Sequence, residues 1–328
     1  MITKTFAFLE RSGPKWLKNL IPEQWRIWVG YQIKVRLGRE PEGFELRRPL
    51  PLPAGQTRKQ IFDYLAALSA DGAVDNAEIL EYLNEACDRY LYTLDLLPKV
   101  GEQTHTGRLL DIGASPYHLT MLIKKFSSYE LSLINYFGET VPREHFDIIH
   151  DGQGEKTTLN YYNINVEVEG IPYPDNSFDV VIMCEVLEHF TNDPVKVIGE
   201  IKRVLSDDGI CILSTPNVAR LENISRLIAG QNMYDPYSGY GPYGRHNREY
   251  TQDELRKLFE GVGFTVETIF TSDVHKNRAD FFYDTKNLQQ ILLNRHGDLG
   301  HYIFVKAVNR PGKANLQKPN WLYRSYSE

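Results

Sequence analysis

Short apolar runs alternate with helical stretches from Arg108 onward, and this alternation constrains the fold of the 328-residue chain more than any other feature. In nearly all the runs, apolar residues follow one another without the polar alternation of a half-exposed strand. Such strands, separated by helices, predict an α/β fold that is doubly wound around a mainly parallel sheet. Ligands of these sheets bind beyond the carboxyl ends of the strands, so functional residues are expected there. The runs are RLLDIG (108–113), YELSLIN (129–135), FDVVIMC (178–184), GICILST (209–215), TVETIF (265–270) and YIFVKAV (302–308).

Helical patterns lie between most of these runs, over Thr120–Phe126, Pro194–Leu205 and Thr251–Val262. The last pattern opens with Thr251 and Glu254, which have the spacing of a capping box. Two more helices are predicted before the first run, over Thr57–Ala70 and Asn76–Leu97, the second with one apolar face.

The composition excludes several other classes of protein. Three scattered cysteines are too few for a disulfide framework or a thiolate metal site. No apolar run approaches the roughly eighteen residues of a membrane-spanning helix. The N-terminal sequence lacks the apolar core and cleavage pattern of a signal peptide. We therefore expect a cytoplasmic protein, and its net charge of −6 gives no support for a general nucleic-acid-binding surface.

Residues 1–55 are predicted to form a basic, tryptophan-containing arm that ends in a proline-rich linker. Residues 1–48 hold ten Lys and Arg against five Glu, and they include Trp16, Trp25 and Trp28. The linker, Arg47–Gln56, reads RRPLPLPAGQ. Two interpretations stay open: the arm packs its aromatic side chains on the main domain, or it makes peripheral contact with a membrane surface or another anionic partner.

A glycine turn follows the first apolar run, in the sequence LLDIGASPYHL (109–119). Gly113 allows a ligand to approach the backbone closely, and the helix start behind it offers free N–H groups to a carboxylate. Asp111 adds a negative charge for a cationic group. Because Ala114, Ser115 and Pro116 replace the further glycines of a dinucleotide fingerprint, the turn alone does not identify its ligand.

The segment from Gly170 to Asn217 resembles class I S-adenosylmethionine-dependent methyltransferases along its whole length. It contains a proline-aromatic turn (IPY), an NSFD turn, an EVLEH strand end, a helix that ends in RVL, and a strand that reads LSTPN. The resemblance covers roughly residues 88–270 and implies a Rossmann-like sheet of seven strands with an N-terminal helical extension. It also implies S-adenosyl-L-methionine as the cofactor. An NAD-binding Rossmann domain is the alternative, but it does not explain the EVLEH block.

The resemblance also implies a division of the chain. Residues 56–100 would form helices that cap the cofactor site, 101–310 the methyltransferase domain and 311–328 a C-terminal tail. Within the domain, 219–250 would form the acceptor-site loop. Its segment Gly230–Tyr250 holds five tyrosines, four glycines and two prolines, which fits either a lid over the acceptor or an ordered loop with small tyrosine cores.

Each part of the cofactor has residues assigned to it by the resemblance. The predicted cofactor-binding residues are Asp111, Gly113, Ala114, Ser115, Asn135, Glu167, Val168 and Glu185. Asp111 and Gly113 would flank the methionine part, Asn135 the ribose, and Glu167 with Val168 the adenine. Asn135 departs from the acidic residue typical of such folds, since an amide accepts one hydrogen bond and donates another.

Glu185, Glu188 and His189 have the spacing that brings side chains to one face of a helix, provided that a helix begins at Glu185. Two carboxylates and an imidazole form a partial shell for a divalent ion such as Mg²⁺ or Mn²⁺. His246, in the block YGRHNREYTQDEL, resembles the histidine that completes a Glu-x-x-Glu-His metal site in small-RNA 2′-O-methyltransferases. Ubiquinone-biosynthesis O-methyltransferases are similar at the first three residues. We predict these four residues as catalytic and as metal ligands.

Other roles for these four residues remain open. His189 or His246 could instead serve as a general base without a metal, or the residues could only organise the local backbone.

The predicted activity is O-methylation of a hydroxyl on a small molecule, glycan or glycolipid. One alternative is 2′-O-methylation of an RNA end, against which the acidic net charge and the lack of an added RNA-binding module argue. The other is a cofactor-binding pseudoenzyme whose arm recruits a partner.

Overall fold

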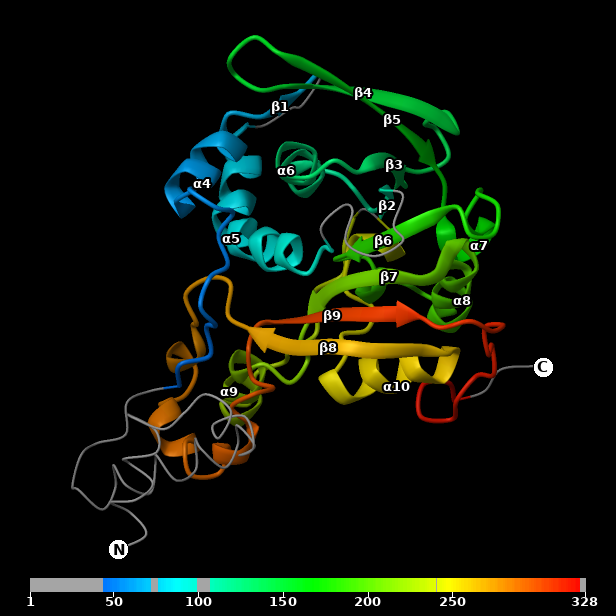
Figure 1. The fold of residues 1–328 in the computed structure, drawn as a ribbon. Coiled ribbons are helices and arrows are strands. Elements are labelled where there is room, and N and C mark those ends of the chain that lie inside the picture. The colour runs from blue at the N-terminus through cyan, green and yellow to red at the C-terminus, as the bar shows by residue number, and fades with distance from the viewer. Residues whose placement is uncertain (1–43, 72–75, 99–106, 240, 325–328) are drawn as a thin grey trace, which may run out of the picture.

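A nine-stranded sheet forms the centre of the protein (Figure 1). The structure is a computed structural model that describes residues 44–71, 76–98, 107–239 and 241–324. Residues 1–43 of the predicted arm, with the three tryptophans, lie outside the described residues, so the two interpretations of the arm stay predictions. The linker Arg47–Gln56 is described and contains no helix or strand. Among the described helices, none is long and apolar enough to cross a membrane.

The strand order is β1-β4-β5-β3-β2-β6-β7-β9-β8. The five central strands, from β5 to β7, run parallel, whereas both edges of the sheet are antiparallel. The strands are β1 (Ser69–Ala70), β2 (Arg108–Ile112), β3 (Glu130–Asn135), β4 (Glu144–His150), β5 (Lys156–Asn163), β6 (Phe178–Cys184), β7 (Leu205–Pro216), β8 (Phe264–Ser272) and β9 (Tyr302–Asn309). The predicted α/β class with a parallel core is confirmed.

The hairpin of β4 and β5 was missed by the sequence analysis, and with β1 it takes the sheet beyond the seven predicted strands. The burial of β5 alternates along the strand, and β4 has a single buried residue, because only one side of this hairpin is covered. Apolar runs therefore do not mark them.

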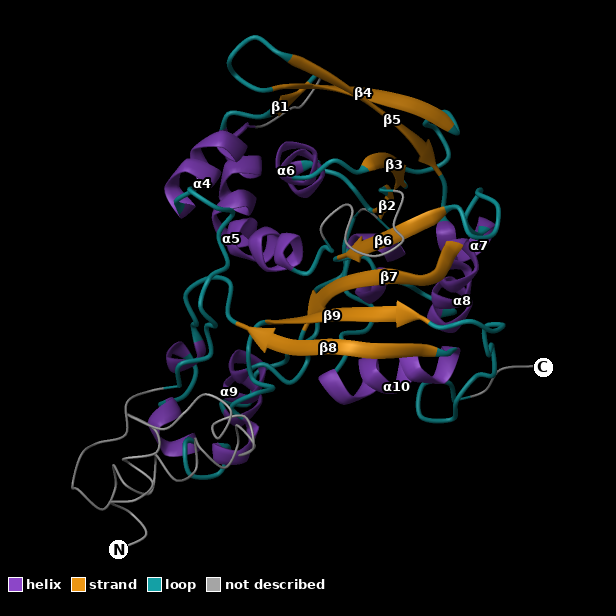
Figure 2. Ribbon diagram, viewed as in Figure 1, coloured by secondary structure: helices purple, strands orange, loops and turns teal. Residues whose placement is uncertain are grey.

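Helices cover both faces of the sheet (Figure 2). One layer contains α4 (Arg58–Ala66), α5 (Asn76–Asp95) and α6 (His118–Phe126), and the other contains α8 (Pro194–Val204) and α10 (Gln252–Val262). Neighbouring residues of β6 pack into different layers: Val180 and Ile182 belong to the core under α4–α6, and Val181 and Met183 to the core under α8 and α10. Burial on both sides explains why β6 is apolar at nearly every position.

The helix predictions are correct in type and differ at some ends. The helix predicted over Thr57–Ala70 stops at Ala66, and its last two residues form β1 instead. The capping box of Thr251 and Glu254 is present at the start of α10, with both reciprocal hydrogen bonds.

The predicted acceptor-site loop, 219–250, begins with a helix, α9 (Leu221–Ile228). The tyrosine-rich remainder contains no α-helix among its described residues, only the 3-10 turn η2 (Pro242–Gly244). Between β8 and β9 the chain leaves the sheet through η3 (Ala279–Phe281), η4 (Thr285–Leu288) and η5 (Leu293–Arg295). These turns pack against α9 and Leu46 in a small apolar cluster of their own.

Candidate active site

The backbone turns sharply where β6 ends. Glu185 has a φ of 58°, in the left-handed region that L-residues seldom adopt, and its N–H donates to the carbonyl of Ser214 on β7. Only a short 3-10 turn, η1 (Leu187–His189), follows. The α-helix start expected at Glu185 is therefore wrong, because this residue belongs to the turn and does not share a helical face with Glu188 and His189.

Two adjacent hydroxyls of β7 hold the two glutamates. Ser214 Oγ donates to Glu185 Oε1 and Thr215 Oγ1 donates to Glu188 Oε2, both at 2.9 Å. Successive side chains of a strand point to opposite faces, and the preceding Ile212 and Leu213 pack into the two different cores. Ser214 thus directs Glu185 toward the α5 side, and Thr215 directs Glu188 toward the other side.

Glu185 forms a largely buried ion pair with Arg89 of α5, whose Nη1 lies 3.0 Å from Glu185 Oε2. Arg89 also donates to the hydroxyl of Tyr82 and lies against three tyrosine rings. Because both carboxylate oxygens of Glu185 are engaged, this residue lies outside the group that Glu188 forms with the histidines.

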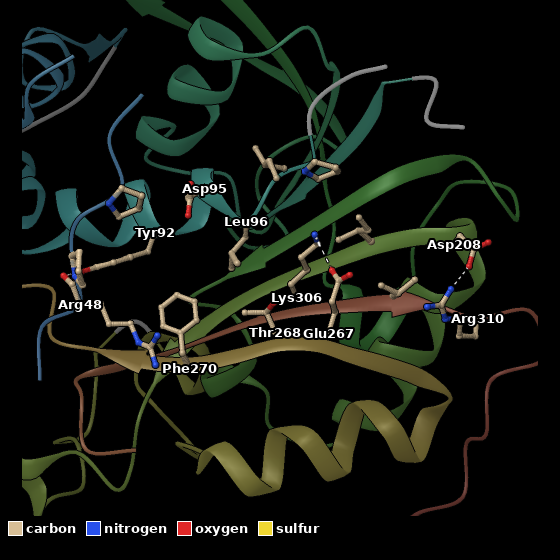
Figure 3. A pocket seen from close by; sticks show the side chains of 16 residues that line it. Arg48, Tyr92, Asp95, Leu96, Asp208, Glu267, Thr268, Phe270, Lys306 and Arg310 are labelled. Carbon is tan, nitrogen blue, oxygen red and sulfur yellow. Dashed lines mark hydrogen bonds and ion pairs between the residues drawn. The ribbon is translucent and has the colours of Figure 1, made fainter. Parts of the chain in front are cut away.

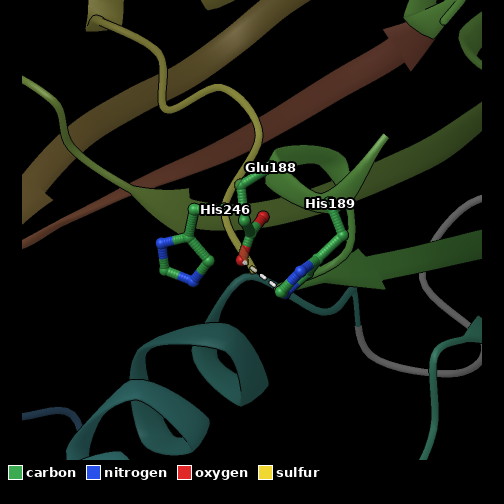
Figure 4. Close-up of side chains that lie close together, drawn as sticks. All are labelled: Glu188, His189 and His246. Carbon is green, nitrogen blue, oxygen red and sulfur yellow. Dashed lines mark ion pairs between the residues drawn. The ribbon is translucent and has the colours of Figure 1, made fainter. Parts of the chain in front are cut away.

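Glu188, His189 and His246 lie close together, with ligand atoms within 4.8 Å of one another (Figure 4). Glu188 is fully buried, and its Oε1 has no hydrogen-bond partner. That oxygen lies 3.8 Å from His189 Nε2. The rings of the two histidines meet edge to face, with centroids 5.1 Å apart. The structure thus brings three of the four predicted residues together.

Both imidazoles use Nδ1 elsewhere. His189 Nδ1 donates to the carbonyl of Arg245 at 3.0 Å, and His246 Nδ1 donates to the carboxylate of Glu249 at 3.0 Å. A neutral histidine that donates from Nδ1 presents a lone pair at Nε2. Two such lone pairs and the unpartnered oxygen of Glu188 converge, and either a proton or a cation between them would satisfy all three acceptors.

His246 is brought to this position by the backbone that follows it. The N–H groups of Asn247 and Arg248 donate to the carbonyl of Glu188 at 2.8 and 3.2 Å. The side-chain amide of Asn247 donates to the carbonyl of His189 at 2.9 Å. The tyrosine-rich loop is therefore fastened directly to η1.

The environment shifts the protonation of this cluster. Burial, helped by the negative charge of Glu185, raises the pKa of Glu188 to about 8. Burial alone would lower the pKa of His246, but the hydrogen bond to Glu249 and the charge of Glu188 outweigh it and leave that pKa raised. The cluster therefore retains a proton near neutral pH when no cation is present.

The glycine turn lies beside the same strand ends. Gly113 has a φ of 77°, and a Cβ added there would lie 2.4 Å from Val186 Cγ2, so no other residue fits. Ser115 N donates to Asn135 Oδ1 at 3.0 Å, and Asn135 Nδ2 donates to the hydroxyl of Tyr117 at 2.9 Å. The side chain of Asn135, predicted beside the ribose, thus holds the turn in place. Ala114, which lies between Gly113 and Ser115 in the sequence, is buried.

Asp111 is buried at the end of β2 and accepts a hydrogen bond from Thr120 Oγ1 at 2.8 Å. Burial raises its pKa to about 6, although the Thr120 hydroxyl opposes the shift. A buried carboxylate of this kind favours a cationic neighbour.

Glu167, predicted beside the adenine, is buried and binds the segment that follows η1. Its carboxylate accepts hydrogen bonds from the backbone N–H groups of Thr191, Asn192 and Asp193. The neighbouring Val168 is 64% exposed and offers an apolar surface.

Sequence reasoning missed three residues of this region. Tyr136, exposed directly after Asn135, meets Tyr243 edge to face at 5.8 Å. Arg89 supports Glu185, and Glu249 supports His246. The sequence held two signals for them: a charged residue within the mainly apolar face of α5, and an acidic residue three positions after His246.

Two cavities differ in their relation to the cluster. The larger, about 960 Å³, lies between the C-terminal end of α5 and the face of β7, β9 and β8, and no residue of the cluster lines it (Figure 3). The smaller, about 380 Å³, is lined by His246 and Glu249 together with Val218 and residues 233–235. The smaller cavity therefore adjoins the cluster.

Comparisons with known proteins identify the family. A family model described as a methyltransferase domain matches residues 59–269, more than half of the chain. An uncharacterized methyltransferase of Bacillus subtilis, YcgJ, is 32% identical over 120 residues, which cover 37% of this chain and 45% of YcgJ. A probable S-adenosylmethionine-dependent methyltransferase of Mycolicibacterium smegmatis is 34% identical over 97 residues, 30% of this chain and 32% of that protein. The chain thus spans less than half the length of these two curated relatives.

Solved structures that match include the YcgJ protein, with a TM-score of 0.41 and 18% identity over 67% of this chain and 99% of that one. An S-adenosylmethionine-dependent methyltransferase from Archaeoglobus fulgidus matches with a TM-score of 0.44 and 16% identity, over 71% of this chain and 99% of its own. The family model extends from α4 to β8 and so includes the glycine turn, the Glu188 cluster and the strands that carry them. The chain belongs to the class I S-adenosylmethionine-dependent methyltransferase family.

Proposed function

We propose that this protein transfers a methyl group from S-adenosylmethionine to a hydroxyl of a small molecule, glycan or glycolipid. One observation carries the proposal: the buried Oε1 of Glu188 has no partner and faces two imidazoles whose Nδ1 atoms are already bonded. A hydroxyl that is methylated must lose its proton, and this cluster can accept a proton or compensate the charge.

The residues around the glycine turn fit S-adenosylmethionine. The cofactor supplies a methyl group on a cationic sulfonium, and it also carries an amine, a carboxylate and an adenine ring. Asp111 suits the cationic amine, and the first N–H groups of α6 suit the carboxylate. Tyr136, directly after β3, and Val168, in the short helix α7 (Val166–Glu169) that follows β5, are exposed, and their side chains suit the faces of the adenine.

Glu188, His189 and His246 also fit a divalent ion. A carboxylate with two imidazoles favours Mn²⁺ or Fe²⁺ over Mg²⁺, which prefers oxygen ligands. When bound, such an ion would lower the pKa of an acceptor hydroxyl. The carbonyl of Arg245 and the carboxylate of Glu249 would fix the orientation of the rings, a support that metal-binding histidines usually have. Glu185 is left out of this set because Arg89 and Ser214 occupy its oxygens.

Calorimetry tests the proposal. We expect the full chain to bind S-adenosylmethionine and its demethylated product, and to bind Mn²⁺ more tightly than Mg²⁺. Glu188→Gln should weaken Mn²⁺ binding by about tenfold or more, with the affinity for the demethylated product unchanged. Glu260→Gln, an exposed acid on α10, is the matched control.

Absence of binding by both forms of the cofactor would overturn the proposal as a whole. If Glu188→Gln binds Mn²⁺ as tightly as the unaltered chain does, the metal is no longer part of the proposal. Methyl transfer that survives complete chelation would assign proton acceptance to Glu188 and His246 without an ion.

A further inference from the structure

The cavity of about 380 Å³ beside His246 has the chemistry of an acceptor subsite. Its walls come from two segments of the tyrosine-rich loop, from Val218 after β7, and from Thr251 and Glu254 at the start of α10. Of the Glu188 cluster only His246 is among the described residues that line the cavity, so a molecule there would meet the cluster at His246. The volume is at the small end of ligand sites and suits a single substituted ring.

The charges that line this cavity are mainly negative. Asp235, Glu249 and Glu254 contribute carboxylates, and Arg248 is the one Lys or Arg among the lining residues described. Arg248 donates to Glu254 at 2.6 Å, so its charge is compensated. Glu249 is likewise paired, with Arg220 and His246. Among the described lining residues the three carboxylates outnumber Arg248 and His246, so a phosphate or sulfate would meet a net negative lining.

Asp235 is the lining carboxylate with room for a ligand. Its Oδ2 accepts the backbone N–H of His246 at 3.2 Å and lies 3.7 Å from His246 Nδ1, and its side chain remains 39% exposed. Among the described residues no hydrogen bond uses Oδ1, which is therefore available to accept a hydroxyl. The neighbouring Tyr234 is 74% exposed, and with Met233 it gives the cavity an apolar wall on which a ring can stack.

We propose that this cavity binds an uncharged ring that carries at least two hydroxyls, with one hydroxyl on Asp235 and another directed to the Glu188 cluster. A sugar and a phenol share this chemistry. The net negative charge of the lining disfavours phosphorylated acceptors, including the end of an RNA chain. This inference rests on the proposed methyl transfer and adds the place and the charge of the acceptor.

Saturation-transfer NMR on the full chain, loaded with S-adenosylhomocysteine, tests the inference with matched probes. Methyl glucoside is compared with glucose 6-phosphate, and catechol with catechol sulfate. We expect signal from at least one uncharged probe, and binding of its charged counterpart at least about tenfold weaker. Asp235→Asn and Tyr234→Ala should each weaken the uncharged probe by about fivefold or more, since an acceptor or a stacking face is lost.

Asp253→Asn is the control, because Asp253 pairs with Lys257 and does not line the cavity. Equal or tighter binding of the phosphorylated or sulfated probe overturns the inference, and so does uncharged-probe binding that Asp235→Asn leaves intact. Absence of a saturation-transfer signal from both uncharged probes overturns it as well. In all these cases S-adenosylhomocysteine still binds, whereas loss of that binding in the unaltered chain would contradict the proposed methyl transfer itself.

Discussion

Glu249 accepts a hydrogen bond from Nδ1 of His246, with 3.0 Å between Nδ1 and Oε1, and this contact leaves Nε2 of the imidazole for the Glu188 cluster. Arg220 holds the other oxygen of Glu249. The pair has the arrangement in which a carboxylate orients a histidine for a metal or for proton transfer.

Replacement of Glu249 tests this relationship. In Glu249→Gln the amide can turn its NH₂ toward His246, which would then hold its proton on Nε2 and lose the lone pair there. We expect Mn²⁺ affinity, measured by calorimetry, to fall by about tenfold to a hundredfold. Glu254→Gln, in the same segment but bonded to Arg248, should retain the affinity. An unchanged affinity in Glu249→Gln would show that Glu249 does not position His246.

Removal of one partner of the ion pair between Arg89 and Glu185 should destabilise the fold more than removal of both partners. Arg89→Met leaves a buried carboxylate without its partner, so the free energy of unfolding in urea should fall by about 3 kcal/mol or more. The double variant Arg89→Met/Glu185→Gln should recover much of that loss, because no unpaired charge remains. The exposed pair of Lys59 and Asp63 is the comparison, and its removal should cost about 1 kcal/mol or less. A loss of that size in Arg89→Met would contradict this account.

Gly113 is expected to tolerate no side chain. Gly113→Ala combines a positive φ with a contact to Val186, and it should both destabilise the fold and abolish cofactor binding. Gly138→Ala separates the two effects, since Gly138 has a φ of 89° but nothing within 4 Å of an added Cβ. This substitution should lower the free energy of unfolding by only about 1 kcal/mol. Gly113→Ala/Val186→Ala should restore part of the binding, and no restoration would argue against the clash as the cause.

The burial of Asp111 predicts a pH dependence of cofactor affinity. Its pKa is about 6, so the carboxylate that suits the cationic amine is lost as the pH falls through this value. Below pH 6 the dissociation constant should rise by about tenfold per pH unit. Asp111→Asn should bind weakly and with little pH dependence between pH 5 and 7.5, as measured by calorimetry. A parallel pH profile in both proteins would exclude Asp111 as the cause.

Stability without the cofactor gives a second readout of the same carboxyl. The pKa in the folded state lies above the unfolded value near 4, so the folded protein holds the proton more tightly. The contribution of Asp111 to the free energy of unfolding is therefore favourable below pH 4 and is lost as the pH rises to 6. Asp111→Asn should not show that decline.

The sequence by itself determined the class of fold and the position of the chemistry. The central strands must be apolar on both faces when helices cover both faces, so their runs were visible. The capping box of α10 is likewise a local pattern, and it is present as predicted. By contrast, β4 and β5 were missed because their hairpin has one largely solvated face and therefore no such run.

Only the tertiary structure decided which of the acidic and histidine residues lie together. Spacing placed Glu185, Glu188 and His189 on one helical face, but the left-handed turn at Glu185 separates them. Ser214 and Thr215, adjacent in β7, then hold the two glutamates on opposite sides. Glu249 completes the site only three residues after His246, whereas Arg89 and Tyr136 do so through contacts between segments far apart in the chain. Such contacts depend on how the elements pack, and no local pattern of residues encodes them.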